Sequence, residues 1–217
     1  MKASANNPLR VLITDDHPTT RIGMRQILEE EFPGMVVVEA GTATESMKRL
    51  GERRWNLLIL DITLHDRDGL EFLREVKQAH PQLPVLMFSV HPENQFAVRA
   101  IKWQASGYLT KERAPEQLAD AVRKILAGGL YLTGSLAEQM AGRLASRSGT
   151  LPHEQLSDRE FQVLLLLAGG MPGKAIGDDL GISQKTISTY RMRLLKKMNM
   201  KTTADLIQYA VRHHLTA

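Results

Sequence analysis

The first 130 residues alternate short, almost continuous apolar runs with longer amphipathic ones. The apolar runs cover 10–14, 35–40, 57–61, 84–89 and 107–109, and their length and composition predict β-strands. Apolar residues recur with helical period over 18–31, 43–51, 69–79, 93–103 and 115–127. Strands that alternate with helices in this way predict a doubly wound, five-stranded parallel sheet. The lack of polar alternation within the strands fits a sheet covered by helices on both faces.

From Leu156 to the end the pattern is purely helical. Ser157 and Glu160 have the spacing of a capping box and predict the start of a helix that ends at two glycines, 169 and 170. A short helix over 174–180 ends at Gly181, and Ser183 is placed to cap a third helix that runs to about residue 197. A helix, a tight turn with glycine and a second helix are the layout of a helix-turn-helix.

The composition changes between these two regions. Residues 135–145 fit a short helix, and the following "SRSGTLP" is polar, small and ended by proline. We therefore predict a disordered N-terminus over 1–8, an α/β domain over 9–129, a linker over 130–152 and a small all-α helix-turn-helix domain over 153–217.

Composition excludes several classes of protein. The chain of 217 residues has no cysteine, so disulfides, zinc-thiolate sites and thiol catalysis are excluded. The first ten residues hold no apolar signal segment, and no run approaches the length of a membrane span. These features predict a cytoplasmic protein with no membrane partner.

The net charge of +4 is unevenly distributed. Residues 1–130 hold 17 basic and 17 acidic side chains, whereas 150–217 hold 9 and 6. Within the second region, 185–201 contain six basic residues and no acid. Such a stretch is often only a solvated helix face, but inside a helix-turn-helix pattern it favours a polyanionic partner.

Polar residues follow the predicted strands where each one ends. Asp15 and Asp16 follow the first strand, Asp61 ends the third, Ser89 ends the fourth and Lys111 follows the fifth. Because the carboxyl ends of parallel strands meet at one edge of a sheet, we expect these residues to lie together. Clustered carboxylates suit Mg²⁺, and a carboxylate can attack phosphorus while an ammonium and a hydroxyl stabilise the phosphoryl oxygens.

Each of these residues alone has an ordinary explanation, since aspartate at a strand end often caps the next helix and a single lysine usually lies in solvent. Their combination in this order is what favours a phosphoryl-transfer site. We expect Asp66 and Asp68 to lie in solvent and to cap the helix over 69–79. His17 is expected to open the helix over 18–31 rather than to bind a ligand.

Residues 9–128 resemble the receiver domain of response regulators, by the order Asp-Asp, Asp, Ser, Lys and by "GYLTK" at 107–111. The resemblance implies that Asp61 is the phosphorylated aspartate and that Ser89 and Lys111 contact the phosphoryl group. It implies that Ser89 and Tyr108 form the conformational switch. It also implies a Mg²⁺ site made by Asp15, Asp16, Asp61 and Thr63.

The third helix of the C-terminal region has two different faces when its residues are placed at 100° per residue. Ile187, Leu194 and Met198 share an apolar face, and Arg191 falls close to it. The opposite face carries basic side chains and small hydroxyl side chains. We expect the DNA-contacting residues of this helix to be Lys185, Thr186, Ser188, Thr189, Arg191, Met192, Arg193, Lys196 and Lys197.

Residues 154–214 resemble the LuxR-type helix-turn-helix of the NarL/FixJ group, through "LSDRE", "KAIGDDLGIS", "KTISTYRMRLLKKMNM" and "TTADLIQYA". The resemblance implies that the last helix, over 204–213, is a dimerisation element. The chain departs from the family at Leu64 and His65, where Met-Pro is common, at Gly173, where Asn is common, and at Tyr190, where His is common.

Together the two regions predict a two-component response regulator, which is not an enzyme. A sensor histidine kinase would phosphorylate Asp61 with Mg²⁺, and this step would control homodimerisation, binding to double-stranded DNA and transcription. Three alternative functions are also compatible with the sequence. They are a Mg²⁺-dependent phosphohydrolase, a LuxR-type regulator that senses a small molecule, and a receiver that acts by protein contact without phosphorylation.

Overall fold

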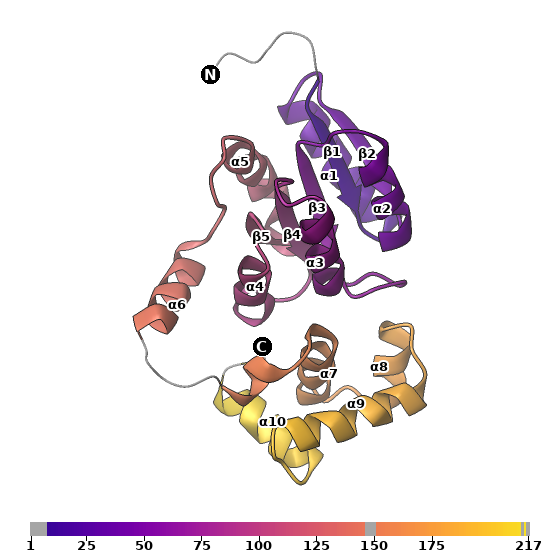
Figure 1. The fold of residues 1–217 in the computed structure, drawn as a ribbon, viewed down its shortest axis with the longest axis vertical. Helices are drawn as coiled ribbons and strands as arrows, with labels where there is room; N and C mark the ends of the chain where they lie inside the picture. The colour runs from indigo at the N-terminus through magenta and orange to yellow at the C-terminus, as the bar shows by residue number, and fades with distance from the viewer. Residues whose placement is uncertain (1–7, 146–150, 214, 216–217) are drawn as a thin grey trace. The chain divides into compact units, whose positions relative to one another are not determined.

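The computed structural model describes residues 8–145, 151–213 and 215 of the chain. The chain divides into two compact units, Met1–Gln139 and Met140–Ala217, and each is described by itself (Figure 1). The predicted disordered N-terminus lies outside the described residues except for Pro8, and residues 146–150 of the predicted linker lie outside them as well. Within the described part of the chain, no helix is long and apolar enough to cross a membrane.

The first unit contains a five-stranded parallel sheet with strand order β2-β1-β3-β4-β5. Its strands are β1 Arg10–Thr14, β2 Val36–Ala40, β3 Leu57–Asp61, β4 Val85–Ser89 and β5 Gly107–Thr110. The predicted sheet is confirmed, and its strands differ from the predicted ranges by at most one residue at either end. The register places Asp61 beside Phe88 and Ser89 beside Thr110, so the carboxyl ends of the three strands are level.

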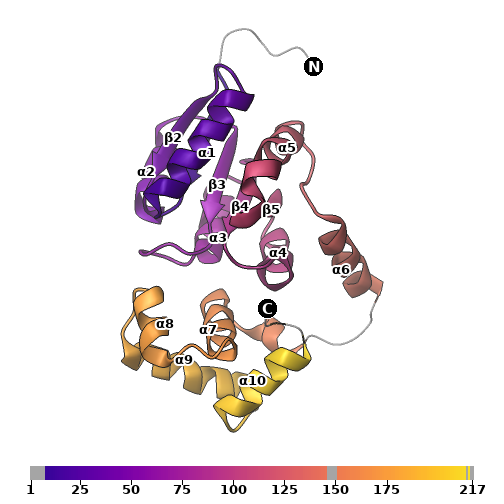
Figure 2. The ribbon, with the colours of Figure 1, turned by 180° about the vertical axis from the view of Figure 1, so that it is seen from behind.

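Five helices pack on this sheet: α1 Pro18–Glu31, α2 Ala43–Glu52, α3 Gly69–Ala79, α4 Glu93–Lys102 and α5 Ala114–Leu126. The two opposite views show α1 and α5 on one face and α2, α3 and α4 on the other (Figure 1 and Figure 2). Side chains of α1 and α5 form one core with Ile13, Ile59 and Phe88 of the sheet. Leu12, Leu58 and Leu60 are fully buried as well. Because neighbouring strand residues point to opposite faces, burial of both faces explains the unbroken apolar runs.

The second unit is helical, with η2 Pro152–Gln155, α7 Asp158–Ala168, α8 Gly173–Asp179, α9 Gln184–Lys197 and α10 Thr203–Arg212. The predicted capping box is present, because Ser157 and Glu160 each accept a hydrogen bond from the backbone of the other. Ser183 caps α9 by accepting from the Thr186 amide at 3.1 Å. Between α8 and α9, Gly181 has a φ of 64°, in the left-handed region that glycine tolerates without strain. The predicted helix-turn-helix is therefore formed by α8 and α9.

The loop after β3 is folded tightly against the end of that strand. The Gly69 amide donates to the Ile62 carbonyl at 2.8 Å, and a Cβ atom on Gly69 would lie 2.6 Å from Ile62 Cα and against the Asp61 carbonyl. Asp68 caps α3 by accepting from the amides of Leu70 at 2.9 Å and Glu71 at 3.1 Å. Asp68 is also buried, which corrects the expectation that it lies in solvent.

The sequence pattern predicted that Asp66 caps α3, but the structure shows that it does not. Its carboxylate accepts from the amides of Ala43 and Thr44, both at 3.0 Å, and from the Thr44 hydroxyl at 3.0 Å. Asp66 therefore caps α2, a helix that lies before β3 in the sequence. The β3–α3 loop is fixed at two points, to α2 by Asp66 and to the strand end by Gly69.

We expect Gly69→Ala to lower the free energy of unfolding of the first unit by roughly 1–3 kcal/mol, because the new methyl group overlaps backbone atoms that cannot yield. Urea unfolding followed by tryptophan fluorescence measures this unit alone, since both tryptophans of the chain, Trp55 and Trp103, lie in it. Gly51→Ala is the matched control. Gly51 lies in α2 with open space around its Cβ position, so this change should stabilise the unit slightly. Equal midpoints for the two variants would contradict the packing described for Gly69.

Candidate functional site

The carboxyl ends of β1, β3, β4 and β5 meet at one edge of the sheet, where Asp15, Asp61 and Ser89 are all buried. Lys111, directly after β5, reaches this edge. Its Nζ lies 2.6 Å from Asp15 Oδ2 and 2.7 Å from Asp61 Oδ2. The structure thus brings together a lysine and two aspartates from three strand ends, separated in sequence by up to 96 positions.

Asp16 lies beside this group with its side chain only 6% exposed. Two histidines contact it: His17 Nδ1 lies 2.5 Å from Asp16 Oδ1, and His65 Nδ1 contacts Asp16 Oδ2. His17 stands at the N-cap of α1, as expected, but its side chain makes no capping hydrogen bond and faces the aspartates instead. The sequence patterns did not assign His65 to the site, although its position was singled out as a departure from the family.

The donor set of this edge fits a divalent cation. Ligand atoms of Asp15, Asp16, His17 and Asp61 all lie within 4.8 Å of one another. Two of the three carboxylates, those of Asp15 and Asp61, contact the ammonium group of Lys111, and carboxylate oxygens are the ligands that Mg²⁺ prefers. The imidazole of His17 adds a nitrogen donor of a kind that suits transition metals better than Mg²⁺.

A series of hydrogen bonds runs from Asp61 to the interior of the unit. The Thr63 amide donates to Asp61 Oδ1 at 3.2 Å, and Thr63 Oγ1 lies 3.3 Å from His91 Nε2. The His91 amide donates to Ser89 Oγ at 3.1 Å, and its carbonyl accepts from the hydroxyl of Tyr108 at 2.9 Å. Tyr108 is buried, so its ring lies inside the unit. Sequence reasoning missed His91, whose only signal was its place two residues after the fourth strand.

Burial raises the pKa of Asp61 to about 6, since a charged carboxylate is poorly solvated there; Lys111 opposes this shift and Asp15 adds to it. Burial by itself would lower the pKa of Lys111, but the carboxylates of Asp61 and Asp15 outweigh it and raise that pKa. Burial also raises the pKa of Tyr108. At neutral pH the site therefore holds the ammonium group of Lys111 beside an Asp61 carboxylate that is mostly but not completely ionised.

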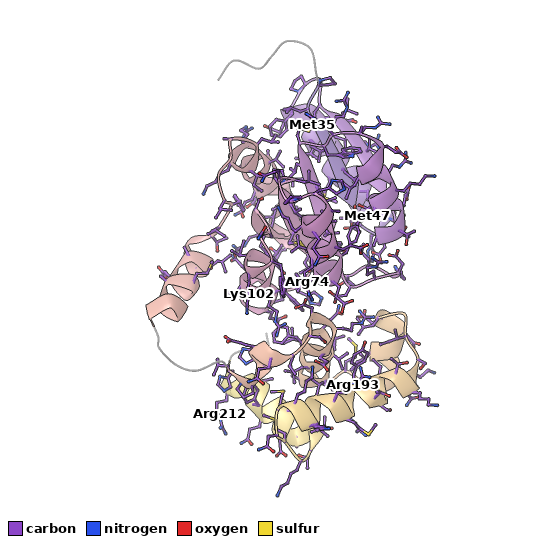
Figure 3. All side chains as sticks on the ribbon, in the orientation of Figure 1. Met35, Met47, Arg74, Lys102, Arg193 and Arg212 are labelled. Atoms are coloured by element: carbon purple, nitrogen blue, oxygen red, sulfur yellow. The ribbon has the colours of Figure 1, made fainter. Side chains whose placement is uncertain are left out.

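The α9 helix of the second unit has one buried and one exposed face. Ile187, Leu194 and Met198 are at most 4% exposed, as the placement at 100° per residue predicted. Met192 is 62% exposed, and Arg193 extends from the helix with its guanidinium 5.9 Å from the centre of the Tyr190 ring (Figure 3). Of the remaining residues expected to contact DNA, six are exposed or partly exposed: Lys185, Thr186, Ser188, Thr189, Arg191 and Lys196.

Lys197 differs from these residues because it is tied to another helix. Its Nζ lies 2.7 Å from Glu160 Oε2, which also accepts from the Ser157 amide at 2.8 Å. Burial alone would raise the pKa of Glu160, but Lys197 and the Ser157 amide together lower it. Lys197 therefore holds α9 against the start of α7, in addition to any role that it has on the exposed face.

Comparison with known proteins gives two family matches. Residues 11–123 match the response regulator receiver domain, and residues 154–210 match the bacterial regulatory proteins of the luxR family. The chain is 31% identical over 208 residues to the response regulator UvrY of Escherichia coli K12, covering 95% of both chains. It is 37% identical over 203 residues to the transcriptional activator protein ExaE of Pseudomonas putida, covering 93% of this chain and 95% of ExaE.

Two solved structures of RcsB, the first of them from Salmonella enterica serovar Typhimurium, are similar to this chain over more than nine tenths of its length. RcsB bound to the promoter rprA with the phosphomimetic BeF₃⁻ has a TM-score of 0.61 at 25% identity, covering 93% of this chain and 98% of RcsB. A structure of two RcsB dimers on two parallel DNAs has a TM-score of 0.59 at 25% identity, covering 94% of this chain and 98% of RcsB.

The raised pKa of Asp61 predicts how stability depends on pH when no metal is present. The pKa is 3.8 when the group is unperturbed and about 6 in the folded chain, so the folded state binds the proton more tightly. Ionised Asp61 therefore destabilises the fold above pH 6, and this effect disappears as the pH falls toward 4. We expect Asp61→Asn to raise the free energy of unfolding near pH 8 by about 2–3 kcal/mol, and to have little effect below about pH 4.5. Urea unfolding in the presence of a metal chelator, followed by tryptophan fluorescence, measures this change in the free energy of unfolding.

Asp66→Asn is the control of opposite sign. Burial alone would raise the pKa of Asp66, but the amides of Ala43 and Thr44 outweigh it and lower that pKa, so the ionised form stabilises the fold. This change should destabilise the unit near pH 8, and the loss should shrink as the pH falls below 4. If Asp61→Asn also destabilised the metal-free chain near pH 8, the electrostatic description of the site would be wrong.

Proposed function

Because the chain belongs to the NarL/FixJ group of response regulators, with a receiver domain followed by a LuxR-type DNA-binding domain, we propose that Asp61 is its phosphorylation site. The protein is a two-component response regulator that acts in transcription rather than as an enzyme. In our proposal a sensor histidine kinase phosphorylates Asp61 in a Mg²⁺-dependent step. The observation that carries this proposal is the position of Lys111 Nζ, 2.7 Å from Asp61 and 2.6 Å from Asp15.

The proposed reaction transfers a phosphoryl group to an Asp61 carboxylate oxygen. That oxygen forms the new bond to phosphorus as the bond from phosphorus to the kinase's histidine nitrogen breaks, and the nitrogen keeps the electron pair. Asp61 is mostly ionised at neutral pH, because its pKa is about 6. The ammonium of Lys111 and the hydroxyl of Ser89, which lie at the same sheet edge, would stabilise the phosphoryl oxygens.

The carboxylates of Asp15, Asp16 and Asp61 would hold Mg²⁺, together with the backbone carbonyl of Thr63. When bound, the ion supplies positive charge that offsets repulsion between the aspartates and the incoming phosphoryl group. The clustering of the carboxylate ligand atoms within 4.8 Å supports this assignment. Ser89 and Tyr108 would act as the switch, and the hydrogen bonds that each makes with His91 support a coupling between them.

The exposed face of α9 would read duplex DNA in the major groove. Its cations are not neutralised by acids within 185–201, and Met192 and the threonines offer apolar contacts to thymine methyl groups. One of the two RcsB structures holds two dimers bound to two parallel DNAs. By analogy, we propose that phosphorylation promotes a homodimer, with α10 as a dimerisation element, that binds paired half-sites of a specific sequence.

The proposed domains keep the boundaries 9–129, 130–152 and 153–217, and the two family matches fall within the first and the third. We propose that the protein works in the cytoplasm, because its proposed partners are chromosomal DNA and a sensor histidine kinase.

Acetyl phosphate or a phosphorylated kinase should label the wild-type chain in Mg²⁺, and Asp61→Asn should abolish the label because the attacking oxygen is gone. Intact-mass spectrometry measures the added phosphoryl group. Asp66→Asn removes a carboxylate from the same loop that lies outside the cluster, so it should still be labelled. Label retained by Asp61→Asn would disprove the assignment.

Lys185→Ala combined with Lys196→Ala should weaken DNA binding at all sequences. Each phosphate contact contributes about 0.9 to the slope of log affinity against log salt, so the slope should fall by about 2. Fluorescence anisotropy over a salt series measures the slope. Lys102→Ala with Lys124→Ala is the charge-matched control, since it removes two exposed cations from the receiver. An equal loss of slope in both pairs would show that total charge, rather than this face of α9, governs binding.

A further inference from the structure

The segment that leaves α5 returns to the edge of the sheet. Tyr131 forms a parallel bridge with Gly107 of β5, and its amide donates to the Ser106 carbonyl at 2.9 Å. Its hydroxyl donates to Gln117 of α5 at 3.0 Å. A Cβ atom on Gly107 would lie 2.9 Å from Tyr131 Cβ and from the Tyr131 carbonyl, so the absence of a side chain at residue 107 allows this approach.

The same segment is attached to the first residue of α4. Thr133 Oγ1 donates to Glu93 Oε2 at 2.6 Å, and Ser135 Oγ donates to the same oxygen at 3.3 Å. Thr133 Oγ1 also accepts from the Leu136 amide at 3.3 Å, at the start of helix α6 Gly134–Ala145. Leu136 is fully buried. Residues 130–136 are therefore held by β5, α5 and α4 together.

The carboxylate of Glu93 is only partly satisfied by this attachment. Within the described part of the chain, Glu93 Oε1 is buried and accepts no hydrogen bond. The donors that reach Oε2 are the neutral hydroxyls of Thr133 and Ser135. A carboxylate with a buried oxygen and so few donors is less stable than one in water or beside a cation. A small movement of Glu93 would thus break the attachment of the segment to α4.

Glu93 follows Ser89, one of the two proposed switch residues, closely along the chain. Ser89 ends β4, Pro92 is the N-cap of α4, and Glu93 comes next. The loop between them is fixed by the hydrogen bonds of His91 to Ser89 and Tyr108. Tyr108, Glu93 and Thr133 also line one small cavity. Any shift of Ser89 toward Asp61 would strain the His91 bond and move the start of α4.

We propose that the surface formed by β5, α4 and α5 is a docking site for the chain's own residues 130–136, with Glu93 as the residue that positions them, and that phosphorylation of Asp61 undocks this segment through the loop of residues 89–92. The docking stands by itself, whereas its control by phosphorylation rests on the proposed function. Because the segment precedes the DNA-binding domain in sequence, its release changes the length of free linker between the domains.

A single introduced thiol measures the docking directly, because the chain has no cysteine. In the full-length Leu136→Cys chain, the buried thiol should react slowly with Ellman's reagent. Adding Thr133→Val removes the hydroxyl that binds Glu93 and should speed the reaction about tenfold, the effect of losing one charge-assisted hydrogen bond. Thr133→Ser keeps the hydroxyl and should restore the slow rate. Thr19→Val makes the same change at an exposed threonine of α1 and should alter the rate less than about twofold.

Thr133→Val also removes the cap of α6, so Glu93→Gln separates the two effects. This change leaves the cap in place and weakens only the acceptor, and it should raise the thiol rate as well. Combined with Thr133→Val, it should add little, because both changes remove the same contact. Additive effects, or equal rates for Thr133→Val and Thr19→Val, would overturn the docking proposal.

Beryllofluoride with Mg²⁺, a mimic of the phosphorylated aspartate, should speed the thiol reaction of Leu136→Cys and have little further effect on the Thr133→Val variant. An unchanged rate in a chain whose Asp61 is labelled by acetyl phosphate would overturn the coupling while leaving the proposed function intact. Absence of labelling would instead count against the proposed function. Hydrogen exchange of the Tyr131 amide, which bonds to Ser106, gives the same test in a chain without substitutions and guards against a destabilised cysteine variant.

Discussion

The ammonium of Lys111 between the carboxylates of Asp15 and Asp61 is the interaction on which the receiver depends. Two buried carboxylates so close together repel each other, and the ammonium of Lys111 offsets that repulsion. The compensation is incomplete, since the pKa of Asp61 is still raised to about 6. The site is therefore electrostatically short of positive charge, which is the condition under which a divalent cation binds.

The same edge of the sheet is mechanically connected to the rest of the unit. Ser89 and Tyr108 both bond to His91, and α4 begins two residues after it with Glu93. The loop after β3 is fixed much more firmly, by Asp66 on α2 and by the close approach of Gly69 to the strand. A change at Asp61 thus meets the β3–α3 loop on one side and, on the other, a loop held by the two hydrogen bonds of His91. The second of these loops is where movement is expected.

In the second unit, the contacts that join α9 to α7 and the exposed cations of α9 lie on different sides of that helix. Glu160 serves the capping box of α7 and binds Lys197, so one buried carboxylate fixes the start of α7 and the end of α9. The remaining cations of α9 lie on its outer side, with the exposed Met192 among them. A rigid helix with an acid-free outer face suits a polyanion, because phosphate contacts fix the position of a protein on the duplex.

The sequence by itself determined the elements and their order, because apolar periodicity, caps and strand-end acids are local properties of the chain. It also placed Asp15, Asp61, Ser89 and Lys111 at one edge, since parallel strands must end together. Only the tertiary structure decided contacts between distant segments: Asp66 on α2 rather than α3, Lys197 on Glu160, His91 between Ser89 and Tyr108, and Tyr131 against Gly107. Such contacts depend on loop paths and side-chain directions that packing selects, and no local pattern encodes them.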